Sequence, residues 1–252
     1  MTEQTPQEEP KQRREPRDAA YWAGYAETLK VSGVAEGATN INVEGRRAVG
    51  PLQGFGKMWQ KTYRIGLEGA EVIPAEVIKT WKENYQEFWP EGNRFYAPLA
   101  GIAPGEVALI SGSMPGGVKL STGVMVLYAD DESFSLMTPE GHPFSGWITF
   151  SSFEEEGTTI AQAQILMRAN DPLYEMGLRM GGHKMEDELW QKTLTNLAAH
   201  FGVHEPVETN LVCVDPRLQW SQYRNIWHNA GIRSAIYSVT APFRWRRNRS
   251  ER

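Results

Sequence analysis

Five runs in which apolar and polar residues alternate follow one another in the middle of the chain. They cover residues 106–111, 118–128, 133–137, 146–153 and 158–168. The segments between them, MPGG, ADDE, PEGHPFS and EEEG, are rich in the residues that favour hairpin turns. Alternation with a period of two is typical of strands that bury one face. The sequence therefore predicts an antiparallel meander, which is the feature that most restricts the fold.

A strand and a helix precede the meander, and a long helix follows it. The strand is indicated by Trp59, Tyr63, Ile65 and Leu67, which alternate with polar residues, and the helix by apolar residues at helical spacing between Pro74 and Phe88. After the meander, Asp171 and Pro172 are typical of a helix start and Gly202 of a helix end. We expect one continuous helix over 171–201.

This order of strand, helix, meander and long helix is typical of an α+β fold. A curved meander exposes its concave face unless something covers it, and the long helix is the obvious cover. Gly177, Gly181 and Gly182 lie in the first half of that helix, although glycine weakens a helix interior. They indicate either close packing of the helix on the sheet or a ligand space beneath it, and both interpretations remain open.

The two ends of the chain differ from this central domain, which we place at residues 55–203. Residues 1–18 are charged and Pro-rich, which predicts a disordered tail, and residues 19–54 form a glycine-rich, loop-rich N-terminal extension that we expect to wrap the domain. Residues 204–252 form a C-terminal extension. It contains an expected aromatic helix around Trp220, Tyr223 and Trp227 and ends in the basic sequence FRWRRNRSER.

Composition excludes several classes of function. The net charge of −5 argues against a general nucleic-acid-binding protein. The single cysteine, Cys213, excludes an intrachain disulfide and a multi-cysteine zinc site, and it fits a reducing compartment. The polar start of the chain and the lack of an apolar run of about 18 residues predict a cytoplasmic protein. We expect no metal, no cofactor and no nucleic-acid partner.

Three short segments add a resemblance to a known family. These segments are PGEVALIS, TPEGHPFSG and ANDPLYEMG. In these segments and in the order of elements, residues 55–203 resemble the START and pollen-allergen (SRPBCC) superfamily. The resemblance implies a helix-grip fold, a curved antiparallel sheet wrapped around a long C-terminal helix, with an apolar cavity that binds or transfers a lipid, polyketide or similar molecule. Some members have cyclase or hydrolase activity.

More locally, the sequence resembles an uncharacterised family of bacterial and plant proteins with a turn of the form T-x-x-G-H-P-x-S-G. The residues that match this form are Thr138, Gly141, His142, Pro143, Ser145 and Gly146. The chain departs from the family at Trp147, where we expect an acidic residue.

We expect a ligand-binding cavity beneath the long helix. The candidate ligand-binding residues are Trp81, Phe134, His142, Trp147, Met180, Gly181 and His183. His142 either shapes a turn by bonding the backbone or meets a ligand headgroup at the cavity mouth. His183 either forms an ion pair with Glu186 on the helix surface or points into the cavity as a polar group.

Three functions remain open. The first is a protein that binds an apolar small molecule. The second is a cyclase or hydrolase that uses the same cavity, with His142 or His183 as the base. The third is a scaffold or peripheral membrane protein whose basic C-terminus contacts an anionic surface. The sequence favours the first, since no nucleophile and base stand at catalytic spacing and a fold alone does not assign a function.

Overall fold

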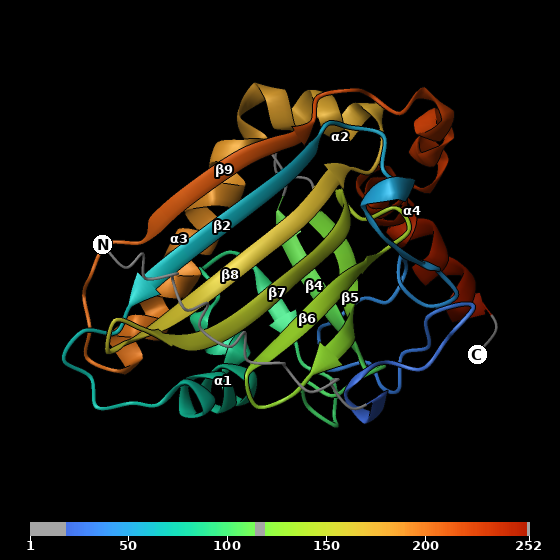
Figure 1. Ribbon diagram of the computed structural model, residues 1–252. Helices are drawn as coiled ribbons and strands as arrows, with labels where there is room; N and C mark the ends of the chain where they lie inside the picture. The colour runs from blue at the N-terminus through green and yellow to red at the C-terminus, as the bar shows by residue number, and fades with distance from the viewer. Residues whose placement is uncertain (1–18, 114–118, 251–252) are drawn as a thin grey trace, which may run out of the picture.

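A curved antiparallel sheet wraps around a long helix in the computed structural model, which describes residues 19–113 and 119–250. Figure 1 shows the strands and, along one face of the sheet, helix α3 (His183–His200). The sheet has the strand order β3-β4-β5-β6-β7-β8-β2-β9, and β1 pairs with the end of β6. This is a helix-grip arrangement, so the predicted α+β fold is confirmed.

The strands include each run expected from the sequence, together with β1, β3 and β9, which were not predicted. They are β1 (Ala48–Val49), β2 (Met58–Gly66), β3 (Arg94–Tyr96), β4 (Val107–Ser113), β5 (Lys119–Ala129), β6 (Ser133–Pro139), β7 (Phe144–Glu155), β8 (Thr158–Ala169) and β9 (Glu208–Asp215). Turn chemistry sets the hairpins: the Asp130 carboxylate accepts the Ser133 N–H at 2.7 Å, and Gly157 adopts a φ of 82°. The expected turn MPGG lies outside the described residues.

The segment from 171 to 201 is not one continuous α-helix, and this corrects the prediction. It consists of α2 (Pro172–Gly177), a π-helical segment η4 (Leu178–Gly182) and α3. Asp171 begins it as expected, because its side chain accepts the N–H groups of Leu173 and Tyr174. The break lies at Met180 and Gly181, where Gly181 has a φ of 115°. Glycine adopts that left-handed conformation without the steric cost that other residues incur.

The core lies between the inner face of the sheet, helix α1 (Pro74–Glu83), the short helix η3 (Tyr85–Phe88) and the second half of α3. Trp81 is fully buried there and packs its ring edge against Phe150, with 4.9 Å between ring centroids. Phe134 stacks on Phe150 at 4.7 Å. The predicted helix ends at Glu83, and η3 continues its apolar face towards the sheet.

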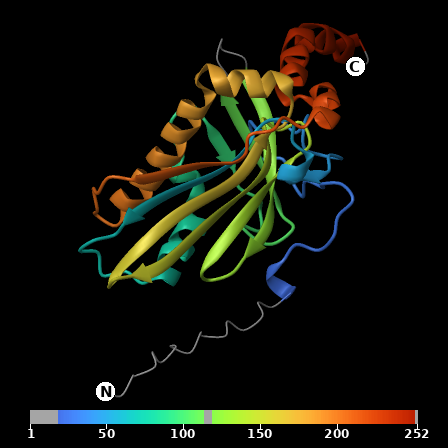
Figure 2. The same ribbon diagram turned by 45° about the horizontal axis from the view of Figure 1, so that its top comes forward.

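The N-terminal segment lies on the face of the sheet opposite α3. It includes the short helices η1 (Ala19–Tyr21) and η2 (Pro51–Gln53). A second apolar cluster holds it there and consists of Leu29 and Val43 together with Val107, Leu109 and Met125 of the sheet. Figure 2 shows this segment, in blue, running beside the sheet. The expected disordered tail, residues 1–18, lies outside the described residues.

The C-terminal segment adds strand β9 along the edge of β2 and continues through the 3-10 helix η5 (Trp220–His228) to α4 (Ala230–Ser250). The expected aromatic helix is thus a 3-10 helix. Its Trp220 and Trp227 side chains are 68% and 77% exposed. The side chains of the basic end, from residue 241 onwards, lie outside the described part of the structure. No helix within the described ranges is long and apolar enough to cross a membrane.

Candidate ligand-binding cavity

A cavity of about 720 Å³ lies between the inner face of the sheet and the helices η3, α2, η4 and α3, and we call it the inner cavity. Its volume falls within the range of about 300–1,000 Å³ that is usual for small-molecule sites. The lining is mainly apolar: Ile110, Val124, Leu136, Ile148, Ile165 and Met167 from the sheet, and Leu178, Met185, Leu189 and Trp190 from the helices. Strand alternation brings the sheet residues to one face, because every second side chain points inward.

Three lining residues carry buried polar atoms without a hydrogen-bond partner among the described residues. These atoms are the Thr122 hydroxyl, the Tyr85 hydroxyl and the Trp89 indole nitrogen. The Tyr85 and Trp89 groups lie close together, but their geometry is not that of a hydrogen bond. Burial raises the pKa of Tyr85, so its hydroxyl remains a donor at neutral pH. Buried polar groups are normally paired, so a ligand with a polar group would complete this arrangement.

A buried ionic cluster adjoins the inner cavity through Glu186. The Lys61 ammonium lies 2.9 Å from Glu186 Oε2 and 2.6 Å from Asp187 Oδ1, and the Tyr63 hydroxyl donates to Asp187 Oδ1 at 2.6 Å. Burial raises the pKa of Glu186 to about 7, despite the opposing charge of Lys61. Near neutral pH, the cavity wall therefore presents a carboxyl group that can give or take a proton.

Sequence reasoning missed this cluster, although the strand pattern contains its signal. Lys61 occupies an inward position between Trp59 and Tyr63, where every other residue of that phase is apolar. A charge at a buried strand position needs an opposite charge nearby, because an unpaired buried ion is very costly. The partners Glu186 and Asp187 lie far away in sequence, so the pairing itself could not be predicted.

His142 both shapes its turn and lines the inner cavity. Its Nδ1 accepts the Phe144 N–H at 3.0 Å, and the His142 N–H donates to the Pro139 carbonyl at 3.1 Å. Burial lowers the pKa of His142 to about 4. The imidazole is therefore neutral at physiological pH, and Nε2 is the ring nitrogen that faces no described hydrogen-bond partner.

The rest of this turn joins both extensions to the sheet. Glu140 lies 2.8 Å from Arg47 of the N-terminal segment and 3.0 Å from His228 of the C-terminal segment. Gly141 has a φ of 90°, and its carbonyl accepts the Ala230 N–H at 2.8 Å. The motif that resembles the bacterial and plant family is thus a structural junction as well as part of the cavity wall.

Five of the other predicted residues do not line the inner cavity, namely Trp81, Phe134, Met180, Gly181 and His183. Trp81 and Phe134 lie in the closed core instead. The prediction for Met180 is wrong, since its side chain is 80% exposed and does not line the cavity. Gly181 supplies the break in the helix. Gly177 and Gly182, in contrast, line the cavity, and a Cβ built on Gly177 would meet no described atom within 4 Å. This favours the ligand-space interpretation for Gly177, whereas a Cβ on Gly182 would lie 2.9 Å from the Gly177 carbonyl oxygen, which is close packing.

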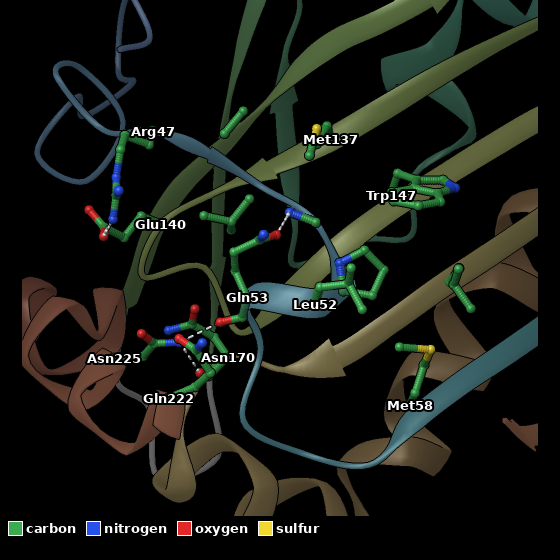
Figure 3. Close-up of a pocket in the computed structure, with 15 residues that line it drawn as sticks. Arg47, Leu52, Gln53, Met58, Met137, Glu140, Trp147, Asn170, Gln222 and Asn225 are labelled. Atoms are coloured by element: carbon green, nitrogen blue, oxygen red, sulfur yellow. Dashed lines mark hydrogen bonds and ion pairs between the residues drawn. The ribbon is translucent and has the colours of Figure 1, made fainter. Parts of the chain in front are cut away.

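The predictions for His183 and Trp147 also change. Among the described residues, Glu186 pairs with Lys61 and not with His183, whose ring packs against Trp59 at 5.1 Å. Burial, with the nearby charge of Lys61, lowers the pKa of His183 to about 4. Trp147 borders the inner cavity, but Figure 3 shows its ring in a second pocket with Met137.

Comparisons with known proteins give low and partial similarities. No protein-family model and no curated protein sequence matches the chain. Among solved structures, it is similar to Ara h 8.0201 with 11% identity over 57% of this chain and 97% of that one, at a TM-score of 0.42. It is similar to protein Ms6760 from Mycobacterium smegmatis with 14% identity over 57% of this chain and 90% of that one, at a TM-score of 0.40. It is similar to the di-domain ARO/CYC StfQ from the steffimycin biosynthetic pathway with 10% identity over 58% of this chain and 53% of that one, at a TM-score of 0.45.

Proposed function

We propose that this protein binds an apolar small molecule, of the lipid or polyketide kind, in the inner cavity. The observation that carries this proposal is the combination of an apolar space of about 720 Å³ with buried, unpartnered polar atoms on Thr122, Tyr85 and Trp89. The apolar lining would supply affinity, and the few polar atoms would orient the ligand. The ligand would therefore carry a hydrogen-bonding group near Thr122 or Tyr85.

Binding without chemistry is favoured over catalysis by the state of the candidate bases. The Nδ1 atom of His142 is engaged by the backbone of Phe144. The Thr122 hydroxyl, which lines the cavity and would be a possible nucleophile, has no base within hydrogen-bond distance among the described residues. Glu186 titrates near neutral pH, but its Oε2 is held by Lys61. An activated nucleophile needs a base in hydrogen-bond contact, and these groups do not provide one.

The test fills the cavity and measures the binding of a neutral fluorescent probe, N-phenyl-1-naphthylamine. Ile110 lines the cavity and is partly buried, so Ile110→Trp should occupy the space and weaken binding at least about tenfold. Leu211→Trp on the exposed strand β9 is the matched control and should bind like the wild type. Equal affinity in all three folded proteins would contradict the proposal. If Ile110→Trp weakens binding, native mass spectrometry of the protein from its own host would identify the natural ligand.

Contact with a membrane surface is a second candidate function, favoured by the exposure of Trp220 and Trp227. Exposed tryptophans are suited to the lipid–water interface, and the arginines at the end of the sequence would favour an anionic surface. Co-sedimentation with phosphatidylserine vesicles tests it. Binding should fall when Trp220 and Trp227 are both replaced by Ala, and binding to pure phosphatidylcholine should be weaker throughout.

A further inference from the structure

A second pocket, of about 750 Å³, lies on the face of the sheet opposite α3, and we call it the outer pocket. Both extensions help to build it: residues 47–53 of the N-terminal segment form one side, and Gln222 and Asn225 of η5 form another. The sheet itself separates it from the inner cavity. Figure 3 shows the outer pocket with these residues around it.

The floor of the outer pocket is a row of large apolar side chains on adjacent strands. Met137 of β6 is directly opposite Trp147 of β7, and Trp147 is directly opposite Leu166 of β8. Met58, at the start of β2, extends the floor. An indole ring with flexible thioether side chains beside it fits the face of a flat apolar molecule. Trp147, the departure from the family pattern, is thus the central residue of this floor.

A buried amide provides the polar end. Asn170 is 1% exposed and lines the pocket. Its Oδ1 accepts the Ser145 hydroxyl at 2.9 Å, its carbonyl accepts the Asn225 amide at 2.8 Å, and its N–H donates to the Pro143 carbonyl at 3.0 Å. Its Nδ2 has no partner among the described residues. A buried amide donor without a partner is rare in native proteins, so an acceptor from a ligand would complete it.

The two charged residues of the pocket lining, Arg47 and Glu140, pair with each other. Arg47 Nη2 lies 2.8 Å from Glu140 Oε1, and Arg46, which is not part of the lining, lies 3.7 Å from Glu140 Oε2. Burial alone would raise the pKa of Glu140, but the hydrogen bond from Arg47 and the nearby charges lower it, so Glu140 stays ionised and paired. The pocket therefore offers no free charge of either sign from this pair, which favours a neutral ligand.

We propose that the outer pocket is a second binding site, for a flat, neutral, apolar molecule whose carbonyl oxygen accepts a hydrogen bond from Asn170 Nδ2. The molecule lies against Trp147, with its carbonyl directed to the end of the pocket where Asn170, Gln222 and Asn225 gather (Figure 3). The proposal is independent of ligand binding in the inner cavity, because Trp147 borders both sites but the other residues of the two linings differ.

The test uses the fluorescent aromatic ketone prodan in protein that carries Ile110→Trp, which fills the inner cavity. Prodan should still bind to a single saturable site. Adding Trp147→Ala, which removes the partly exposed ring of the floor, should weaken that binding at least about fivefold. Asn170→Asp, which keeps the acceptor for Ser145 but removes the donor, should weaken it at least about fivefold and change the emission maximum of bound prodan.

Circular dichroism would show whether each variant keeps its fold, and Trp147→Ala alone decides the test if Asn170→Asp does not fold. Met137→Ala removes a floor residue that lines the outer pocket and not the inner cavity, so it should weaken prodan binding but leave the binding of N-phenyl-1-naphthylamine to the wild-type inner cavity unchanged. The absence of saturable prodan binding in Ile110→Trp, or binding that Trp147→Ala leaves unchanged, would overturn the proposal.

Discussion

Lys61 of β2 and Glu186 of α3 form an ion pair of 2.9 Å in which both side chains are almost completely buried. Asp187 lies 2.6 Å from the same ammonium group. The cluster joins the strand that begins the core to the helix that covers it. A buried ion pair fixes a geometry more strongly than it adds stability, since its attraction is offset by desolvation. The position of α3 over the inner cavity therefore depends on this contact.

Removing the cation should destabilise the protein strongly. Lys61→Met leaves the buried Glu186 and the partly exposed Asp187 without an opposite charge, and the free energy of unfolding should fall by about 3–5 kcal/mol. Urea unfolding measures this. The double variant Lys61→Met with Glu186→Gln leaves fewer uncompensated charges and should recover part of the loss. A loss below about 1 kcal/mol in the single variant would mean that the ion pair does not anchor α3.

The raised pKa of Glu186 makes stability depend on pH near neutrality. Its pKa is about 7 in the folded protein, and about 4.3 is usual for an exposed glutamate in an unfolded chain. The folded state therefore binds more protons between these values, and stability falls as pH rises through this window. Relative to Glu186→Gln, the wild type should lose unfolding free energy between pH 5.5 and pH 7.5. A difference that does not change with pH would refute the raised pKa.

The lowered pKa of His142 should make stability depend on pH in the opposite direction to that of Glu186. Its pKa is about 4 when folded and about 6.5 when unfolded, so the unfolded chain binds the extra proton between these values. Stability should therefore fall as pH drops from 6.5 to 4. His142→Asn keeps an acceptor for the Phe144 N–H and should flatten this dependence, whereas His204→Asn at an exposed position should not. Because His142 stays neutral in the folded protein between pH 6 and pH 8, this residue should not make ligand affinity depend on pH over that range.

Gly141 should not tolerate a side chain. It has a φ of 90°, and a Cβ there would lie 2.1 Å from the carbonyl oxygen of His228. Gly141→Ala should cost at least about 2 kcal/mol and should make residues 216–229 more sensitive to limited proteolysis. Gly157→Ala is the matched control, because Gly157 has a φ of 82° but no described atom within 4 Å of its Cβ position. Similar losses in both variants would show that the contact with His228 is unimportant.

Thr122→Val should stabilise the ligand-free protein. The Thr122 hydroxyl is buried without a described partner, so replacing it with a methyl group removes a desolvation cost of about 1 kcal/mol. Thermal unfolding measures the gain. The affinity for N-phenyl-1-naphthylamine should stay the same, whereas a natural ligand that bonds to Thr122 should bind more weakly. Destabilisation of the ligand-free protein would show that the hydroxyl already has a partner.

The fold could be predicted because its signals are local. Alternation defines each strand of the meander, and Asp171, Pro172 and Gly202 mark the ends of the long helical segment. The break at Gly181 could not be predicted from its position, since three glycines in that stretch permit several conformations. Strand β9 was not expected either, because its residues are mostly exposed and it exists through pairing with β2.

The site was harder to predict, because a cavity depends on which face of each strand points inward and on contacts between distant residues. Trp147 shows the first difficulty, since its ring lies on the opposite face from the residues of the inner cavity. Met180 shows that a local break matters as well: Gly181, the next residue, has a left-handed conformation that changes the course of the helix and leaves the Met180 side chain exposed. His142 was found because a histidine between turn residues is visible in the sequence itself.

The position of β2 in the sheet has a consequence for how the chain folds. Trp59 pairs with Met167 on one side and with Cys213 on the other, so both neighbours of β2 are synthesised long after it. Pairings between distant segments form slowly, because a large loop must close before they contribute. A nascent chain that stops before β9 would expose the outer backbone edge of β2, and unpaired edges promote association between chains. Pairing with residues 208–215 therefore covers this edge only after the last strand of the sheet has been synthesised.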